Sequence, residues 1–107
     1  MDDVFSEIAR SLREGTPLAV ATVTATRGST PRKAGARMAI RPDGSFCGTV
    51  GGGGGEAEVR SVAMEVLETG RPRLVTVDFS DPIYGEDKVS GGLVDVFVER
   101  ITPGGAL

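Results

Sequence analysis

Five consecutive glycines, Gly51 to Gly55, are the feature of this sequence with the clearest chemical potential. Glycines let backbone N–H groups converge without interference from a Cβ, and a helix that follows adds the positive end of its dipole. The run therefore suits an anion such as phosphate, with tight backbone packing as the alternative. A flexible linker makes little sense here, because the run lies between a strand-like and a helix-like segment. The run also lacks the Gly-Lys-Ser/Thr ending of a Walker motif.

Glu56 directly follows the glycines. A carboxylate in the first turn of a helix stabilises that helix through its dipole, by roughly 0.3–1 kcal/mol. The same side chain would accept a proton, or a hydrogen bond from the N–H groups of a ligand. Glu56 is therefore also a weak candidate for a catalytic base.

The loop from Arg27 to Gly35 supplies the positive charge and the hydroxyl groups that the glycines lack. No Asp or Glu occurs from Gly15 to Pro42, a stretch that contains five of the twelve basic residues. Arginine grips phosphate in a bidentate fork, and segregated charge creates a local positive field. The alternative is an ordinary solvated basic face.

A third cluster, Ser90-Gly91-Gly92, precedes the last strand-like segment and is either a further wall of the same cleft or a simple turn. A ligand with a phosphate and an N–H-rich ring would use the basic loop, the glycines and the carboxylate together. The predicted binding residues are Arg27, Gly28, Ser29, Thr30, Arg32, Lys33, Gly51, Gly52, Gly53, Gly54, Glu56, Ser90, Gly91 and Gly92.

Composition excludes several other chemistries. The chain has 107 residues, no His, a single Cys, no Trp and one Tyr. Imidazole catalysis, an intrachain disulfide, a thiolate zinc cluster and an aromatic platform for single strands are therefore excluded or disfavoured. With a net charge of −3, duplex nucleic acid is a poor partner. The acidic N-terminus and short apolar segments predict a soluble cytoplasmic protein without a signal peptide or membrane span.

The elements that must position these loops follow from periodicity. Helices are expected over 2–14 and 56–69, the first with Val4, Phe5, Ile8 and Leu12 on one face. Strands are expected over 18–26, 36–41, 46–50, 73–79 and 93–100, and residues 102–107 are expected to fray. The first strand has the continuous apolar character of a central strand, and Asp43-Gly44 marks a hairpin turn. The prediction is a single α/β domain over 1–107, with a mixed sheet of about five strands and two flanking helices.

The three loops, in this order, resemble the N-terminal domain of the XdhC/CoxI family of xanthine dehydrogenase accessory proteins. The likeness spans nearly the whole chain, and the matching pieces are 28–38 (GSTPRKAGARM), 43–53 (DGSFCGTVGGG), Glu56, Asp78 and 91–99 (GGLVDVFVE). The resemblance implies a protein that binds molybdopterin, the molybdenum cofactor, without catalysis of its own. It further implies delivery of that cofactor to a xanthine dehydrogenase- or CO dehydrogenase-like enzyme, and self-association into a homo-oligomer.

This sequence differs from the family pattern in two cysteine positions and in its domain content. Family members usually carry Cys where Gly54 and Ser90 stand here. They usually also have a C-terminal nucleotide-binding domain that these 107 residues do not include, which is expected either of a natural one-domain member or of a fragment. Cys47 is a weak substitute, because a free cysteine within a strand is commonly just buried. Two alternatives therefore stand beside the accessory role: a diverged interaction or oligomerisation module, and a small enzyme acting on a phosphorylated substrate with Glu56 as base.

Overall fold

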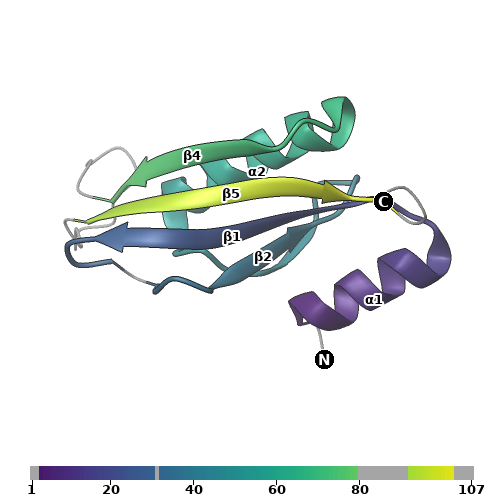
Figure 1. Cartoon of the computed structure of the whole chain (residues 1–107), viewed down its shortest axis with the longest axis horizontal. Helices are drawn as coiled ribbons and strands as arrows, with labels where there is room; N and C mark the ends of the chain where they lie inside the picture. Colours follow the sequence, from purple (N-terminus) through teal and green to yellow (C-terminus); the bar gives the residue numbers. More distant parts are fainter. Residues whose placement is uncertain (1–2, 31, 80–91, 103–107) are drawn as a thin grey trace.

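One five-stranded sheet with a helix against each face makes up the computed structural model, which describes residues 3–30, 32–79 and 92–102. The strand order is β3-β2-β1-β5-β4. The helix α2 packs on one face, and α1 lies against the other face near β2 (Figure 1). The elements are α1 (Val4–Glu14), β1 (Leu18–Arg27), β2 (Arg37–Ile40), β3 (Phe46–Gly48), α2 (Gly53–Thr69), β4 (Arg73–Asp78) and β5 (Leu93–Ile101). The predicted α/β architecture of five strands and two helices is confirmed.

The sheet is antiparallel at each of its four pairings, so the predicted mixture of parallel and antiparallel strands was wrong. The helix α2 does carry the chain across the sheet, from β3 at one edge to β4 at the other. These two strands run in the same direction, but three strands separate them. The crossover therefore creates no parallel neighbours.

The boundaries of α1 follow from its caps. The Asp3 carboxylate accepts a hydrogen bond from the Ser6 N–H at 2.7 Å, and Gly15 ends the helix in the left-handed conformation. Both are standard ways to satisfy terminal backbone groups. The helix begins two residues later than predicted, because Asp3 is the cap and not part of the first turn.

The buried face of α1 differs from the predicted one. Val4 is buried, but Phe5 and Leu12 are 66% and 49% exposed, whereas Glu7 is buried. The Glu7 carboxylate accepts hydrogen bonds from Arg10 and Arg41, each at 2.7 Å. Because the two guanidinium groups compensate the carboxylate, a polar side of the helix can face the sheet.

The central strand β1 is buried on both faces in its first half, as predicted from its continuous apolar character. The larger apolar cluster lies under α2 and consists of Ala19, Ala21, Val23, Met38, Ile40, Val50, Val59, Ala63, Val66, Val77, Phe79, Val94, Val96 and Val98. The smaller cluster lies under α1 and consists of Val4, Leu18, Val20, Ala39 and Cys47. Within the described residues, neither helix has the length and apolar character needed to span a membrane.

Glu7 makes the attachment of α1 sensitive to acid. Hydrogen bonds from Arg41 and Arg10 hold the pKa of Glu7 below its ordinary value of 4.5. A lowered folded-state pKa stabilises the fold above the unfolded-state pKa, and this stabilisation is lost as pH falls through the folded value. The melting temperature of the wild type should therefore fall more steeply below pH 4.5 than that of Glu7→Gln.

At neutral pH the Glu7→Gln variant should be less stable by about 1–3 kcal/mol, because the Arg41 guanidinium loses its charged acceptor. Glu68→Gln, an exposed change on α2, is the control and should behave as wild type. Parallel acid melting curves for the wild type and Glu7→Gln would contradict this account of α1.

Candidate anion-binding site

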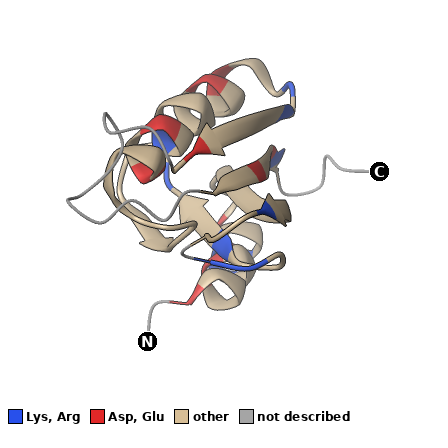
Figure 2. Cartoon of the chain, turned by 90° about the vertical axis from the view of Figure 1, so that its left-hand side faces the viewer, with Lys and Arg blue, Asp and Glu red and all other residues tan. Residues whose placement is uncertain are grey.

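The register of the sheet brings the predicted site loops to one end of the molecule. Arg27 at the end of β1 lies opposite Leu93 at the start of β5, and Asp78 at the end of β4 also pairs with Leu93. The start of β2 and the end of β3 lie at this same end, because each strand runs antiparallel to its neighbour. Figure 2 views the molecule from this end, where both basic and acidic positions are visible.

Gly92 joins the basic loop to the end of β4. A Cβ at Gly92 would overlap the carbonyl oxygens of Arg27 and Ser29 and the methyl group of Thr30, so only glycine permits this approach. The Phe79 N–H donates to the Gly92 carbonyl at 2.8 Å. The basic loop and the Ser90-Gly91-Gly92 cluster therefore meet at Gly92. Ser90 and Gly91 themselves lie outside the described residues.

The glycine run reaches the same end through α2. This helix begins at Gly53 and not at Glu56, so three glycines form its first turn. Gly52 and Gly53 have φ angles of +81° and +61°, which favour glycine. A Cβ on Gly55 would lie 2.8 Å from Val77 and 2.9 Å from the Phe79 ring. Close packing thus accounts for Gly55, and backbone conformation accounts for Gly52 and Gly53.

Glu56 binds the loop that precedes it. Its Oε2 accepts hydrogen bonds from the Thr49 hydroxyl at 2.5 Å and from the Gly52 N–H at 3.1 Å. The Thr49 hydroxyl oxygen in turn accepts the Gly51 N–H at 3.0 Å. The protein's own carboxylate therefore engages part of the glycine loop, and Thr49 is a site residue that the sequence reasoning missed.

The next two amides of the run have no acceptor among the residues that the structure describes. Among the hydrogen bonds between described residues, none is donated by the N–H of Gly53 or Gly54. These groups stand in the first turn of α2, where the helix dipole favours negative charge. Gly53 is exposed and Gly54 is half-buried, so both lie within reach of a ligand.

Arg27 is paired within the protein. Its guanidinium donates to both carboxylate oxygens of Asp95, at 2.9 and 3.1 Å, and the Thr76 hydroxyl donates to Asp95 at 2.8 Å. The pKa of Asp95 is lowered mainly by the hydrogen bonds from Arg27, and the pKa of Arg27 is raised by the same pair. Asp95 thus neutralises the charge on Arg27, a partner that the sequence reasoning did not identify.

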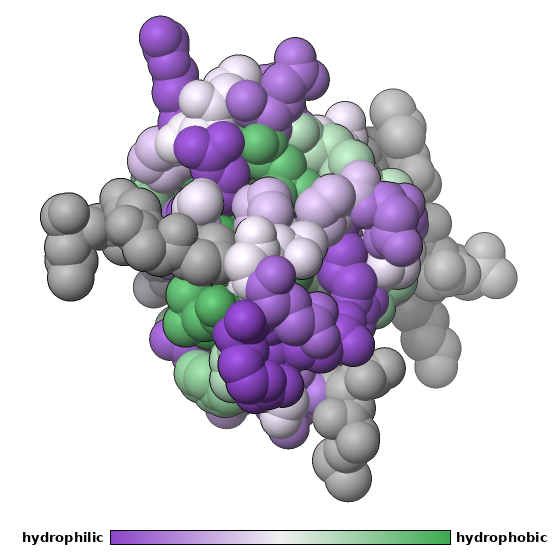
Figure 3. Space-filling view, turned by 90° about the vertical axis from the view of Figure 1, so that its right-hand side faces the viewer, coloured by the Kyte–Doolittle hydropathy of each residue, from purple (hydrophilic) through white to green (hydrophobic). Residues whose placement is uncertain are grey.

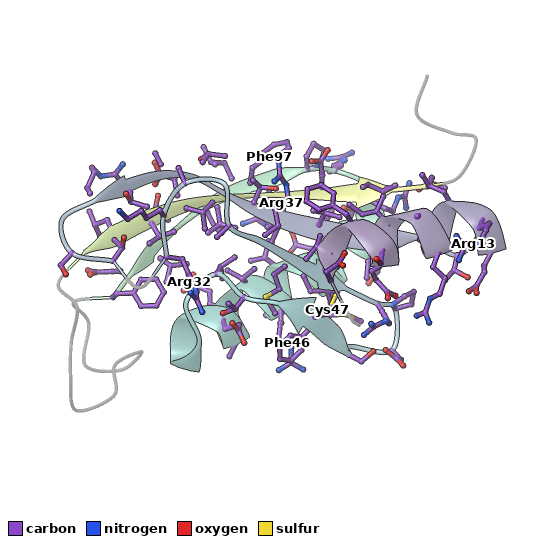
Figure 4. All side chains as sticks on the ribbon, turned by 90° about the horizontal axis from the view of Figure 1, so that it is seen from below. Arg13, Arg32, Arg37, Phe46, Cys47 and Phe97 are labelled. Atoms are coloured by element: carbon purple, nitrogen blue, oxygen red, sulfur yellow. The ribbon has the colours of Figure 1, made fainter. Side chains whose placement is uncertain are left out.

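Arg32 and Lys33 carry positive charge that no described residue neutralises in an ion pair. Both are exposed, and the ion pairs between described residues include neither of them. The Thr30 hydroxyl donates to the Arg32 carbonyl at 2.9 Å and so shapes the loop. Figure 4 shows Arg32 on the side of the sheet that carries α2. The Arg32 side chain therefore lies on the same side as the first turn of α2.

Two further side chains complete the description of this half of the molecule. Glu58 lies one turn into α2, and its Oε1 is buried without a hydrogen-bond partner among the described residues. Sequence reasoning did not identify this residue. Cys47, the single cysteine of the chain, is buried in β3, as expected. The described residues contain no group of three or more His, Cys, Asp or Glu side chains that would suit a metal ion.

Comparison with known proteins gives one family and several relatives. The sequence profile of the XdhC and CoxI family matches residues 11–78. Two Escherichia coli proteins are similar: YqeB, 36% identical over 90% of this chain, and the molybdenum cofactor insertion chaperone PaoD, 30% identical over 85%. The matched regions cover 18% and 29% of those two proteins, so this chain corresponds to less than a third of either.

The fold has a solved counterpart. A crystal structure from Bacillus halodurans, described as a xanthine dehydrogenase, superposes with a TM-score of 0.75 and 26% identity. The match covers 89% of this chain and 29% of that one.

The hydrogen bonds of Glu56 and Thr49 predict which side chains hold the glycine turn in place. Glu56→Ala removes the acceptor for Gly52, and Thr49→Val removes the hydroxyl between Glu56 and Gly51. Each variant should accelerate hydrogen exchange at the Gly52 amide and cost about 0.5–2 kcal/mol of unfolding free energy, as for the loss of a helix cap. Glu68→Ala is the control. Unchanged Gly52 exchange in Glu56→Ala would show that the carboxylate does not hold this turn.

Proposed function

We propose a function for this chain, which belongs to the XdhC and CoxI family. It binds molybdopterin, the molybdenum cofactor, and delivers it to a xanthine dehydrogenase- or CO dehydrogenase-like enzyme. Similarity to a chaperone named for insertion of this cofactor supports the proposal. In this role the chain acts without catalysis of its own.

The observation that carries the proposal is a set of cationic side chains and backbone N–H groups, at one end of the sheet, that have no partner among the described residues. Arg32 and Lys33 have no ion-pair partner among the described residues, and the Gly53 and Gly54 amides have no acceptor there. Molybdopterin has a phosphate, and guanidinium, ammonium and helix N-terminal amides are groups that bind phosphate. In this proposal these four residues hold the phosphate, and Gly28, Ser29 and Thr30 shape the loop beside it.

The pterin ring requires acceptors for its N–H groups. Glu56 lies at the start of α2 with one carboxylate oxygen committed to Thr49 and Gly52. Its other oxygen is the acceptor that we assign to the ring. The cofactor would supply redox chemistry to the client enzyme, and this chain would supply binding and release.

Exposure of the binding groups suits transfer. Arg32, Lys33 and Gly53 are all exposed, so a client could approach a bound cofactor from solvent. Hydrogen bonds to charged groups contribute about 1.5–3 kcal/mol each, and fewer enclosing contacts mean faster release. A site at the surface is therefore compatible with a carrier that gives its ligand away.

Exposed apolar surface supports the interaction module as the second candidate function. On the sheet face opposite α2, β4 and β5 are not covered by a helix (Figure 1), and Leu74 on β4 is 63% exposed. A contact with the client enzyme, or with a second copy in a homo-oligomer, would cover such a surface. Catalysis by Glu56 is disfavoured, because its Oε2 already accepts two hydrogen bonds from the protein.

Titration with molybdopterin tests the proposal. Wild-type protein should bind it saturably, and the double variant Arg32→Gln/Lys33→Gln should bind about 10–100-fold more weakly, as expected for the loss of charged hydrogen bonds. The control Arg13→Gln/Arg71→Gln makes the same change of net charge at exposed positions outside the site loops, and it should bind as wild type.

Two results would oppose the cofactor role. Equal weakening by the two double variants would mean that net charge alone attracts the ligand. Absence of saturable binding to folded wild-type protein would leave the interaction module as the better account.

A further inference from the structure

A cavity of about 260 Å³ lies at the end of the sheet opposite the site loops. Its walls are one face of α1, the segment that enters β1, and the turn between β2 and β3. Figure 3 views this end of the molecule, where hydrophilic and hydrophobic surfaces lie side by side. We call it the α1 cavity, and its lining residues are Glu7, Arg10, Ser11, Glu14, Thr16, Pro17, Leu18, Arg41, Pro42 and Asp43.

The polar base of the α1 cavity is fixed by internal bonds. The Glu7 side chain is only 8% exposed, and its Oε2 accepts from both Arg10 and Arg41. The buried Ser11 hydroxyl donates to the Thr16 carbonyl and so ties α1 to the segment entering β1. The cavity is therefore formed in advance by side chains that are already held in place.

Arg10 and Glu14 contribute opposite charges to the lining. Arg10 and Glu14 are one helical turn apart on α1 and both line the cavity, yet they are not among the ion pairs between described residues. Arg10 uses one terminal nitrogen for Glu7, which leaves its other N–H groups for a second acceptor. Glu14 lies in the last turn of α1, where the helix dipole favours a cation beside it.

Among the remaining lining residues, Pro17, Leu18 and Pro42 are apolar, whereas Thr16 and Asp43 are polar. Leu18 is buried at 1% exposure, so the apolar surface that a ligand can reach belongs mainly to Pro17, which is half-buried, and Pro42, which is exposed. Pockets for drug-sized ligands typically measure about 300–1,000 Å³, so this smaller volume suits a molecule the size of an amino acid.

We infer that the α1 cavity binds a small zwitterion, an α-amino acid with a compact apolar side chain. Arg10 binds its carboxylate, Glu14 binds its ammonium group, and Pro17 and Pro42 contact its side chain. The site is separate from the proposed cofactor site and does not rest on that function. A bound zwitterion would link α1 to the β2–β3 turn.

Three probes that share one hydrocarbon body test this inference. Leucine has both charged groups, 4-methylpentanoate has only the carboxylate, and 3-methylbutylamine has only the ammonium group. Amide chemical shifts of α1, Thr16, Leu18, Arg41 and Asp43 should move saturably with leucine. The affinity for leucine should exceed that for each of the other probes by about tenfold or more, because each lacks one charged contact.

Substitutions of Arg10 and Glu14 test which side chain binds each charged group of the ligand. Arg10→Gln and Glu14→Gln change exposed side chains and should each weaken leucine binding by about fivefold or more. Arg13→Gln, also exposed on α1 but outside the cavity lining, is the matched control and should leave the affinity unchanged. Each variant should keep the wild-type pattern of amide shifts elsewhere, which shows that the fold is intact.

Three outcomes would overturn the inference. These are equal affinity for the three probes, equal effects of Arg10→Gln and Arg13→Gln, and no shift with leucine up to about 10 mM, a concentration that would reveal even weak binding.

Discussion

The pairing of β1 with β5 is the constraint on which the candidate site depends. It joins a strand near the start of the chain to the last strand, and its register places Arg27 opposite Leu93. That register brings Gly92 against the backbone of the basic loop and Asp95 against Arg27. Because α2 spans the sheet and begins at this same end, its glycine turn joins the group. Without this one pairing, the loops would have no reason to share an end of the molecule.

Charge at the site is divided between structural and available groups. Arg27 and Asp95 neutralise each other, and Glu56 uses one oxygen to hold the turn that precedes it. Among the described residues of the site, the groups without such a partner are the side chains of Arg32 and Lys33 and the first amides of α2, which we propose hold the anion. The chain as a whole has a net charge of −3, so attraction of an anion must come from this local arrangement. Within the glycine run, Gly55 permits close packing, whereas the N–H groups of Gly53 and Gly54 donate no hydrogen bond to another described residue.

Local patterns in the sequence were sufficient to predict the elements. The hairpin at Asp43-Gly44, the end of the first helix at residue 14 and the burial of the first half of β1 on both faces each depend on residues close together in the chain, and the structure confirms them. Family resemblance supplied the cofactor as a hypothesis, and the profile match establishes the family.

Long-range partners could not be predicted in the same way. Asp95 is 68 residues from Arg27, and Arg41 is 34 residues from Glu7. Glu7 could therefore not be recognised as buried, and the apolar spacing of Phe5 and Leu12 favoured the wrong face of α1. The antiparallel sheet was missed for a related reason, because strand order is decided by contacts between distant segments.

The most direct measurement of the central claim is the change in amide chemical shifts when molybdopterin is added to the isotope-labelled chain. The account predicts that the resonances of Gly53 and Gly54 move most and that those of residues 32 and 33 move with them. Shifts confined to other surfaces, with the first turn of α2 unchanged, would contradict the claim that the N–H groups of Gly53 and Gly54 and the side chains of Arg32 and Lys33 form one anion site.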